Sequence, residues 1–166
     1  LSNPEQQRIA KRQTTNSEAY QLYLKDRYYW NKRTEDGFRR ALDHFKQAID
    51  HDPSYAPAYA GEADCYSLLA RYQYEAPRDS FPLARAAATK ALQLDDTTAE
   101  VHASLAYVAY NFDWNWAESE REFQRAIQLD PTYATAHHWY GLMLAAVGNV
   151  DGAIKELTEA RRLEPL

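Results

Sequence analysis

A short motif recurs along the chain, and this repeat constrains the fold more than any other feature of the sequence. In each copy the end of one amphipathic segment leads into an acidic or proline-containing turn, after which another segment begins. The copies read AIDHDPSYAPAYA, ALQLDDTTAEVHA, AIQLDPTYATAHH and ARRLEPL, at residues 48–60, 91–103, 126–138 and 160–166. One turn position recurs at spacings of 43, 35 and 34 residues, occupied by Pro53, Asp96, Pro131 and Pro165. A period of this size is typical of an array of helix–turn–helix units.

Between the turns, apolar residues follow the period of an α-helix and not that of a strand. The segment ALDHFKQAI places four residues on one helix face, namely Ala41, Phe45, Ala48 and Ile49. EREFQRAIQL and AIKELTEARRL repeat this spacing. Asn115 followed by Glu118 predicts a capped helix start, Ser54 and Thr132 are expected to open helices, and Gly148 predicts a helix end. The pattern predicts an all-α fold.

The unit resembles the tetratricopeptide repeat, which reads W-x2-L-G-x2-Y, then A-x3-F-x2-A, then P. The last unit matches best, with His137, Tyr140, Gly141, Leu144, Ala153, Leu157, Ala160 and Pro165 in the motif positions. The resemblance implies an α-solenoid, a right-handed superhelix of about four antiparallel helix pairs. We expect residues 1–16 to form an N-terminal extension or linker helix. Residues 17–166 then form the repeat domain, with units at 17–53, 54–96, 97–131 and 132–166.

Two longer stretches, residues 18–66 and 109–141, look like the tetratricopeptide region at the C-terminal end of large bacterial signalling proteins. In those proteins the N-terminal part is a winged-helix DNA-binding domain or a serine/threonine kinase. The resemblance implies a sensing or docking part of a regulatory protein. Because the first residue is Leu1 and not Met, we expect the chain to be a piece of such a longer protein.

In a solenoid of this kind the first helix of each pair lines the concave groove. Stepping four and seven residues along each first helix from the residue after its aromatic motif position gives a set of groove residues, which includes the apolar Ala60, Ala103, Leu142 and Ala145. The predicted partner-binding set is Gln21, Lys25, Tyr28, Asp64, Ser67, Tyr107, Tyr110, Asn111 and His138. Tyrosines with few charges suit a peptide segment or partner surface. Lys25 is the only basic member and Asp64 would repel a carboxylate, so we do not expect chaperone C-terminal tails to bind.

Two alternatives to the peptide-binding module stay open at this point. Tetratricopeptide arrays commonly close with an extra solvating helix, whereas this chain ends at Leu166 without one. The exposed C-terminal end then predicts a self-associating structural module, a homo-oligomer that docks through that end. The other alternative is an intramolecular regulator that senses a small ligand and controls a missing effector domain.

Charge and composition narrow the partners further. The net charge of −5 argues against nucleic acid as a partner of this fragment, although residues 1–40 carry nine Lys or Arg against five Asp or Glu. No stretch is apolar enough to span a membrane. We expect a soluble domain in the cytoplasm, or in the periplasm if the parent chain carries a membrane span. The single cysteine, Cys65, is expected to be a small buried residue.

The sequence offers no convincing catalytic, cofactor or metal site. His102 and His137 occupy equivalent positions in neighbouring units, but no third ligand has suitable spacing for zinc, so we expect both to pack in the core. No nucleophile–base pair and no glycine-rich phosphate loop are present, so we expect no enzyme activity. Trp114 is expected to pack at a turn, with a ligand-binding rim as the alternative. Glu62 breaks the motif, and we expect it to reach solvent or to pair with a base such as Arg85.

Overall fold

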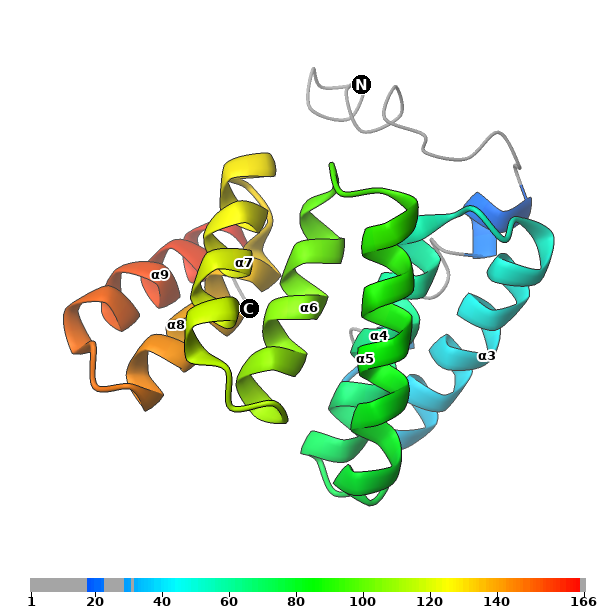
Figure 1. Ribbon diagram of the computed structural model, residues 1–166, viewed down its shortest axis with the longest axis horizontal. Helices are drawn as coiled ribbons and strands as arrows, with labels where there is room; N and C mark the ends of the chain where they lie inside the picture. Colours follow the sequence, from blue (N-terminus) through cyan, green and yellow to red (C-terminus); the bar gives the residue numbers. More distant parts are fainter. Residues whose placement is uncertain (1–17, 23–28, 31, 165–166) are drawn as a thin grey trace.

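The computed structural model describes residues 18–22, 29–30 and 32–164 of the chain. Residues 18–22 and 29–30 are helical, and seven longer helices follow. These helices are α3 (Glu35–His51), α4 (Ala56–Arg71), α5 (Pro77–Leu94), α6 (Ala99–Asn111), α7 (Trp116–Leu129), α8 (Ala134–Ala146) and α9 (Val150–Leu163). The part of the chain described here contains no β-strand. Figure 1 shows the helices side by side, in chain order from α3 to α9.

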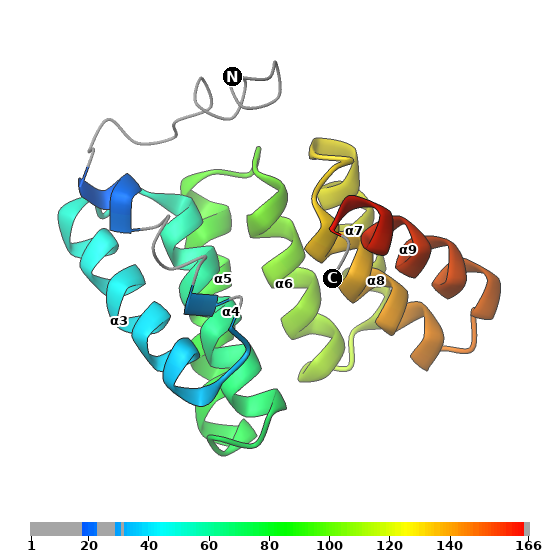
Figure 2. The ribbon, with the colours of Figure 1, turned by 180° about the vertical axis from the view of Figure 1, so that it is seen from behind.

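Successive helices pair and the pairs stack in series. Helix α4 packs on α5, α6 on α7, and α8 on α9. The first helices of these pairs also contact one another, α4 with α6 and α6 with α8, whereas the backbones of the described helices α5 and α7, and of α7 and α9, do not approach each other closely. An ion pair between Arg85 and Glu118 links α5 to α7. Figure 2 shows α3 and α9 at opposite ends of this array. The all-α solenoid of antiparallel helix pairs is therefore confirmed, and α4, α6 and α8 form its inner layer.

The acidic residue of each turn organises the chain between pairs. A side-chain oxygen of Asp52 accepts hydrogen bonds from the backbone N–H and the hydroxyl of Ser54, at 3.0 and 2.6 Å. Asp95 holds Thr97 in the same way, and Asp130 holds Thr132. Ser54 and Thr132 thus belong to the turns and do not cap helices, so the expectation that they open α4 and α8 is wrong. The carboxylate satisfies backbone groups that the turn would leave unpaired.

Two glycines allow the helices to approach closely. A Cβ atom at Gly61 would overlap the ring of Phe45 on α3, and one at Gly141 would lie 2.7 Å from Cγ of Leu157 on α9. Side chains from a neighbouring helix therefore fit against bare backbone on the inner helices. Gly148 has a φ of +82° just after α8, which confirms the predicted helix end.

The capping prediction at α7 is also confirmed, because the Asn115 side chain accepts a hydrogen bond from the Glu118 N–H at 3.2 Å.

Glu62 does not pair with Arg85, which instead binds Asp113 and Glu118. Half-burial raises the pKa of the Glu62 carboxyl, and the charge of Lys46 opposes that rise. Of the two explanations for Glu62, pairing with Arg85 is therefore wrong.

None of the described helices is long and apolar enough to cross a membrane.

Candidate functional site

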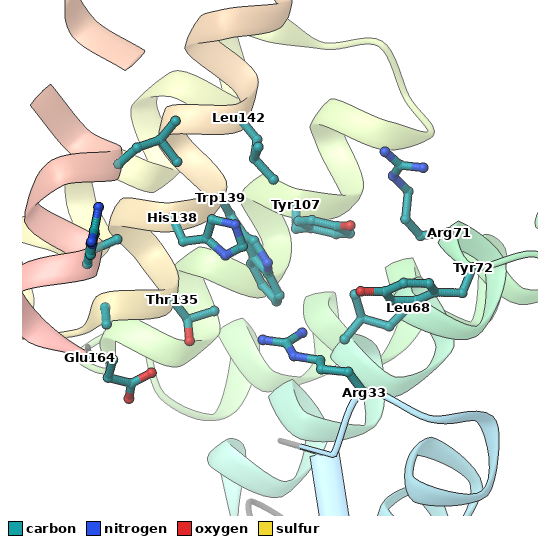
Figure 3. A pocket seen from close by; sticks show the side chains of 14 residues that line it. Arg33, Leu68, Arg71, Tyr72, Tyr107, Thr135, His138, Trp139, Leu142 and Glu164 are labelled. Carbon is teal, nitrogen blue, oxygen red and sulfur yellow. The ribbon is translucent and has the colours of Figure 1, made fainter. Parts of the chain in front are cut away.

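The inner layer and the last helix enclose a pocket of about 560 Å³, shown in Figure 3. Helix α4 contributes its last turn, α6 one tyrosine, α8 one whole face, and α9 its C-terminal part. We call this site the groove pocket. Its lining consists of Arg33, Leu68, Arg71, Tyr72, Tyr107, Ala134, Thr135, His138, Trp139, Leu142, Leu157, Ala160, Arg161 and Glu164.

Two buried aromatic rings form the apolar floor of the groove pocket. The ring centroids of Tyr107 on α6 and Trp139 on α8 lie 4.2 Å apart, and their side chains are 4% and 2% exposed. Trp30 also contacts Trp139, edge-on with ring centroids 6.2 Å apart. These rings join the inner helices to one another, and Tyr107 and Trp139 lie at the base of the pocket beneath its more exposed side chains. Such a floor suits an apolar or aromatic side chain of a ligand.

Helix α8 presents one continuous face to the groove pocket. Thr135, His138 and Leu142 line it at spacings of three and four residues, which places them on one side of a helix. Leu142 is 40% exposed although it is a large apolar residue. In Figure 3 it lies with His138 on the pocket side opposite Leu68 and Tyr72. A ligand could therefore cover Leu142 without any helix moving.

Positive charge collects around this apolar floor. Arg33, Arg71 and Arg161 line the groove pocket, whereas Glu164 is the single acidic residue in its lining. The Arg33 guanidinium lies 3.8 Å from the centre of the Trp30 ring, a cation–π contact that holds it in place. In Figure 3 its side chain points toward Thr135 and Trp139.

Burial and nearby charges shift the pKa values of two side chains in the pocket, His138 and Tyr107. Partial desolvation in the pocket and the positive charge of Arg33 together lower the pKa of His138, which favours the neutral form of this imidazole. Burial raises the pKa of the Tyr107 hydroxyl, and the charge of Arg71 opposes that shift. The groove pocket is thus cationic through its arginines and not through its histidine.

Buried histidine–glutamate pairs fix the inner helices to their partners. His137 Nδ1 lies 2.6 Å from Oε2 of Glu156, and its Nε2 lies 3.1 Å from the carbonyl oxygen of Pro131. His102 repeats the arrangement, with Glu122 at 2.7 Å and the carbonyl of Asp96 at 2.8 Å. Each ring nitrogen therefore lies within hydrogen-bond distance of an oxygen atom, one in a glutamate side chain and one in a backbone carbonyl. The expected burial of both histidines is confirmed, and their polar atoms tie together the helix pair and the preceding turn.

The structure brings two members of the predicted partner-binding set into the groove pocket, Tyr107 and His138. Asp64 and Ser67 are buried on α4, and Asp64 accepts a hydrogen bond from the Ser104 hydroxyl of α6 at 2.6 Å.

The other members of the set lie outside the pocket lining. Tyr110 packs on Trp116, and Asn111 donates a hydrogen bond to the Tyr107 carbonyl at 2.9 Å. Gln21 is exposed on the first described helical segment. Lys25 and Tyr28 lie outside the described residues.

Some aromatic side chains of the turn at residues 111–118 pack on neighbouring helices, and one is largely exposed. Phe112 stacks on Phe81 with ring centroids 5.3 Å apart, and Trp116 packs on Tyr110 at 5.6 Å. Trp114 contacts the Trp116 ring edge-on, with centroids 5.8 Å apart, but it is 70% exposed and has a φ of +54°, so the expectation that it closes the top of a helix pair is wrong. No group of three His, Cys, Asp or Glu side chains that could hold a metal ion occurs within residues 18–22, 29–30 and 32–164.

Comparison with known proteins supports the fold and leaves the function open. No family model matches the chain. The transcriptional regulator HilA of Salmonella typhimurium is 22% identical over 144 residues, which is 87% of this chain and 26% of the regulator. The chain thus spans about a quarter of the length of that relative.

Solved structures resemble the chain over most of its length. TTC0263, a thermophilic tetratricopeptide-repeat protein of Thermus thermophilus, matches 96% of the chain and 79% of its own at 18% identity, with a TM-score of 0.71. YrrB, a tetratricopeptide-repeat protein with an unusual peptide-binding site, matches 87% of the chain and 68% of its own at 20% identity, with a TM-score of 0.51. The chain therefore has the tetratricopeptide-repeat fold.

Proposed function

We propose that the chain is a protein-interaction module that binds a peptide segment or partner surface in the groove pocket. The observation that carries this proposal is the apolar floor of Tyr107 and Trp139, open to a ligand between three helices of the inner layer. Tetratricopeptide-repeat proteins of similar fold include one named for its peptide-binding site. In this proposal the module recruits a partner and catalyses no reaction itself.

The resemblance to a transcriptional regulator supports a place in a larger bacterial regulatory protein. In that setting the groove pocket recruits a partner, and a separate output domain acts on the signal. A soluble location, in the cytoplasm or in the periplasm, follows from the same proposal. Of the predicted contact set, Tyr107 and His138 are the positions that we retain as contacts in the pocket.

Leu142→Ser tests the groove directly, because this side chain is 40% exposed and is not part of the buried core. We expect peptides selected from a random phage-displayed library against the unaltered chain to bind the variant roughly tenfold more weakly, since apolar contact is lost. Binding is measured by fluorescence anisotropy. Ile154→Ser is the matched control, since Ile154 is 59% exposed on α9 and lies outside the pocket lining. Equal affinities of the two variants would contradict the proposed function.

Self-association is a second candidate, favoured by an exposed apolar strip at the last helix pair. Val147, Val150 and Ile154 are 49%, 62% and 59% exposed. An apolar strip of this kind is covered when another copy docks on it. Light scattering is expected to show a dimer at high concentration that Ile154→Lys abolishes and Leu142→Ser leaves intact. A monomer at every concentration would rule out this candidate and leave the groove proposal standing.

A further inference from the structure

The cations of the groove pocket stand out against the charge of the whole chain. The chain carries a net charge of −5, yet the pocket lining holds Arg33, Arg71 and Arg161 against Glu164 alone. A positively charged site on a negatively charged protein attracts anionic ligands, which the rest of the protein surface repels. The pocket therefore selects for negative charge.

Two of these arginines have no carboxylate partner within the described part of the chain. Arg39, Arg85 and Arg162 each form an ion pair with a glutamate. Among the described residues Arg71 and Arg161 form none, although both are exposed at the rim of a pocket. Their guanidinium groups are therefore available to a ligand. Arginine suits this role because its planar fork binds a carboxylate through two parallel hydrogen bonds.

The apolar floor lies directly beside these charges. Trp139 and Tyr107 offer aromatic carbon, and Leu142 adds an exposed aliphatic side chain. An ion pair formed against such a surface is less screened by water than one on an open helix face. The combination fits a ligand that presents an apolar side chain with carboxylates next to it.

We propose that the groove pocket receives an acidic segment of a partner protein. An aromatic or aliphatic side chain of that segment packs on Leu142 above the Tyr107–Trp139 floor, and its flanking Asp or Glu carboxylates bind Arg71 and Arg161. The inference rests on the proposed function and adds the chemistry of the partner. These arginines stand at the end of α4 and on α9, so the site does not reproduce the Lys, Asn and Arg groove positions of the chaperone-tail clamp. Asp64, which would oppose a carboxylate in the groove, is buried against Ser104.

The residue composition of peptides selected from a random library tests the inference. We expect the selected peptides to be enriched in Asp and Glu beside an aromatic or aliphatic residue. Selected peptides that lose affinity with Leu142→Ser but show no acidic enrichment would overturn this inference and leave the groove function standing. A library that yields no binder would overturn both. Displacement of an acidic peptide by a simple dicarboxylate such as succinate at equal concentration would identify a small-anion site and overturn the assignment to a peptide.

Variants of the two unpaired arginines give a second and independent readout. We expect Arg71→Gln and Arg161→Gln each to weaken an acidic peptide by roughly tenfold and to reduce the salt dependence of binding. Arg125→Gln is the matched control, because Arg125 is exposed on α7 outside the pocket lining and carries the same charge. A control peptide with Asn and Gln in place of its Asp and Glu residues should bind all three variants with the same affinity. Equal losses with all three variants would overturn the inference.

His138 reports on the same event by NMR. Partial desolvation and Arg33 lower its pKa in the free protein, and Arg71, Arg161 and Glu164 are the other charged groups of the pocket lining. A bound carboxylate favours the protonated imidazole, so the pKa of His138 should rise when the acidic peptide binds and stay unchanged with the neutral one. No change with either bound peptide would place the carboxylates elsewhere and contradict the inference.

Discussion

Replacing His137 with alanine is expected to lower the free energy of unfolding by about 3–5 kcal/mol. The substitution leaves the carboxylate of Glu156 buried without the ring that it contacts at 2.6 Å. The Pro131 carbonyl loses its side-chain partner as well. Urea denaturation followed by circular dichroism measures the loss.

The neighbouring histidine provides the control for this prediction. His138 is exposed in the groove pocket and lies outside the buried histidine–glutamate pairs, so His138→Ala should change the unfolding free energy by no more than about 0.5 kcal/mol. The double variant His137→Phe with Glu156→Leu should recover most of the lost stability, because no buried carboxylate remains. Equal effects of the two single histidine variants would show that the buried pair does not hold α8 on α9.

Trp139→Ala carries the second large expected effect, a loss of about 3–5 kcal/mol of stability. Trp139 is 2% exposed and packs against both Tyr107 and Trp30, so its removal opens a cavity between the inner helices. Trp139→Phe should cost less, since part of the ring contact with Tyr107 survives. The measurement is again urea denaturation, and a loss below about 1 kcal/mol for Trp139→Ala would contradict the assignment of this ring to the core.

The same burial limits what can be learned from Tyr107. This tyrosine is 4% exposed and shares the floor of the pocket with Trp139. Its replacement by alanine would disturb both stability and binding, so loss of partner capture could not be assigned to the groove. Leu142 and Arg71, which are exposed, separate the two effects.

The helix pairs could be predicted from sequence because their signals are local. The acidic turns, the spacing of Phe45 and Ala41, and Gly148 each specify backbone within a few residues. Even within one turn, however, the pattern does not show which of two polar side chains accepts the hydrogen bonds. The organising role of Asp52 was misassigned to Ser54 because both residues flank the same proline, and only the hydrogen bonds show which side chain accepts.

The groove pocket was predicted less completely, for reasons that individual residues make clear. Arg71 lies seven residues after Asp64 on α4, so continuing the helical stepping by one turn beyond Ser67 would have reached it. Asp64 itself is buried because α6 packs against that part of α4, which stepping along a single helix does not take into account. Arg33 enters the pocket from a connecting turn with positive φ, and no periodic signal marks it.

The histidines show how polar residues can occupy a repeat core. The motif position of His137 takes an aromatic residue in the family pattern, and burial followed from that match. The partner could not be predicted in the same way, because Glu156 lies nineteen residues away on the following helix. The same buried histidine–glutamate pair occurs in the preceding unit as His102 with Glu122, so two consecutive units share this polar contact in their cores.

The most direct test of the central claim is a methyl NMR titration with a peptide selected on the unaltered chain. The account predicts that the methyl signals of Leu68, Thr135 and Leu142, which line the groove pocket, shift on binding. Those of Leu83, Val150 and Ile154, exposed outside the pocket lining, should stay in place. The reverse pattern, with shifts confined to Val150 and Ile154, would place the partner on the outer face of α9 and contradict the groove as the binding site.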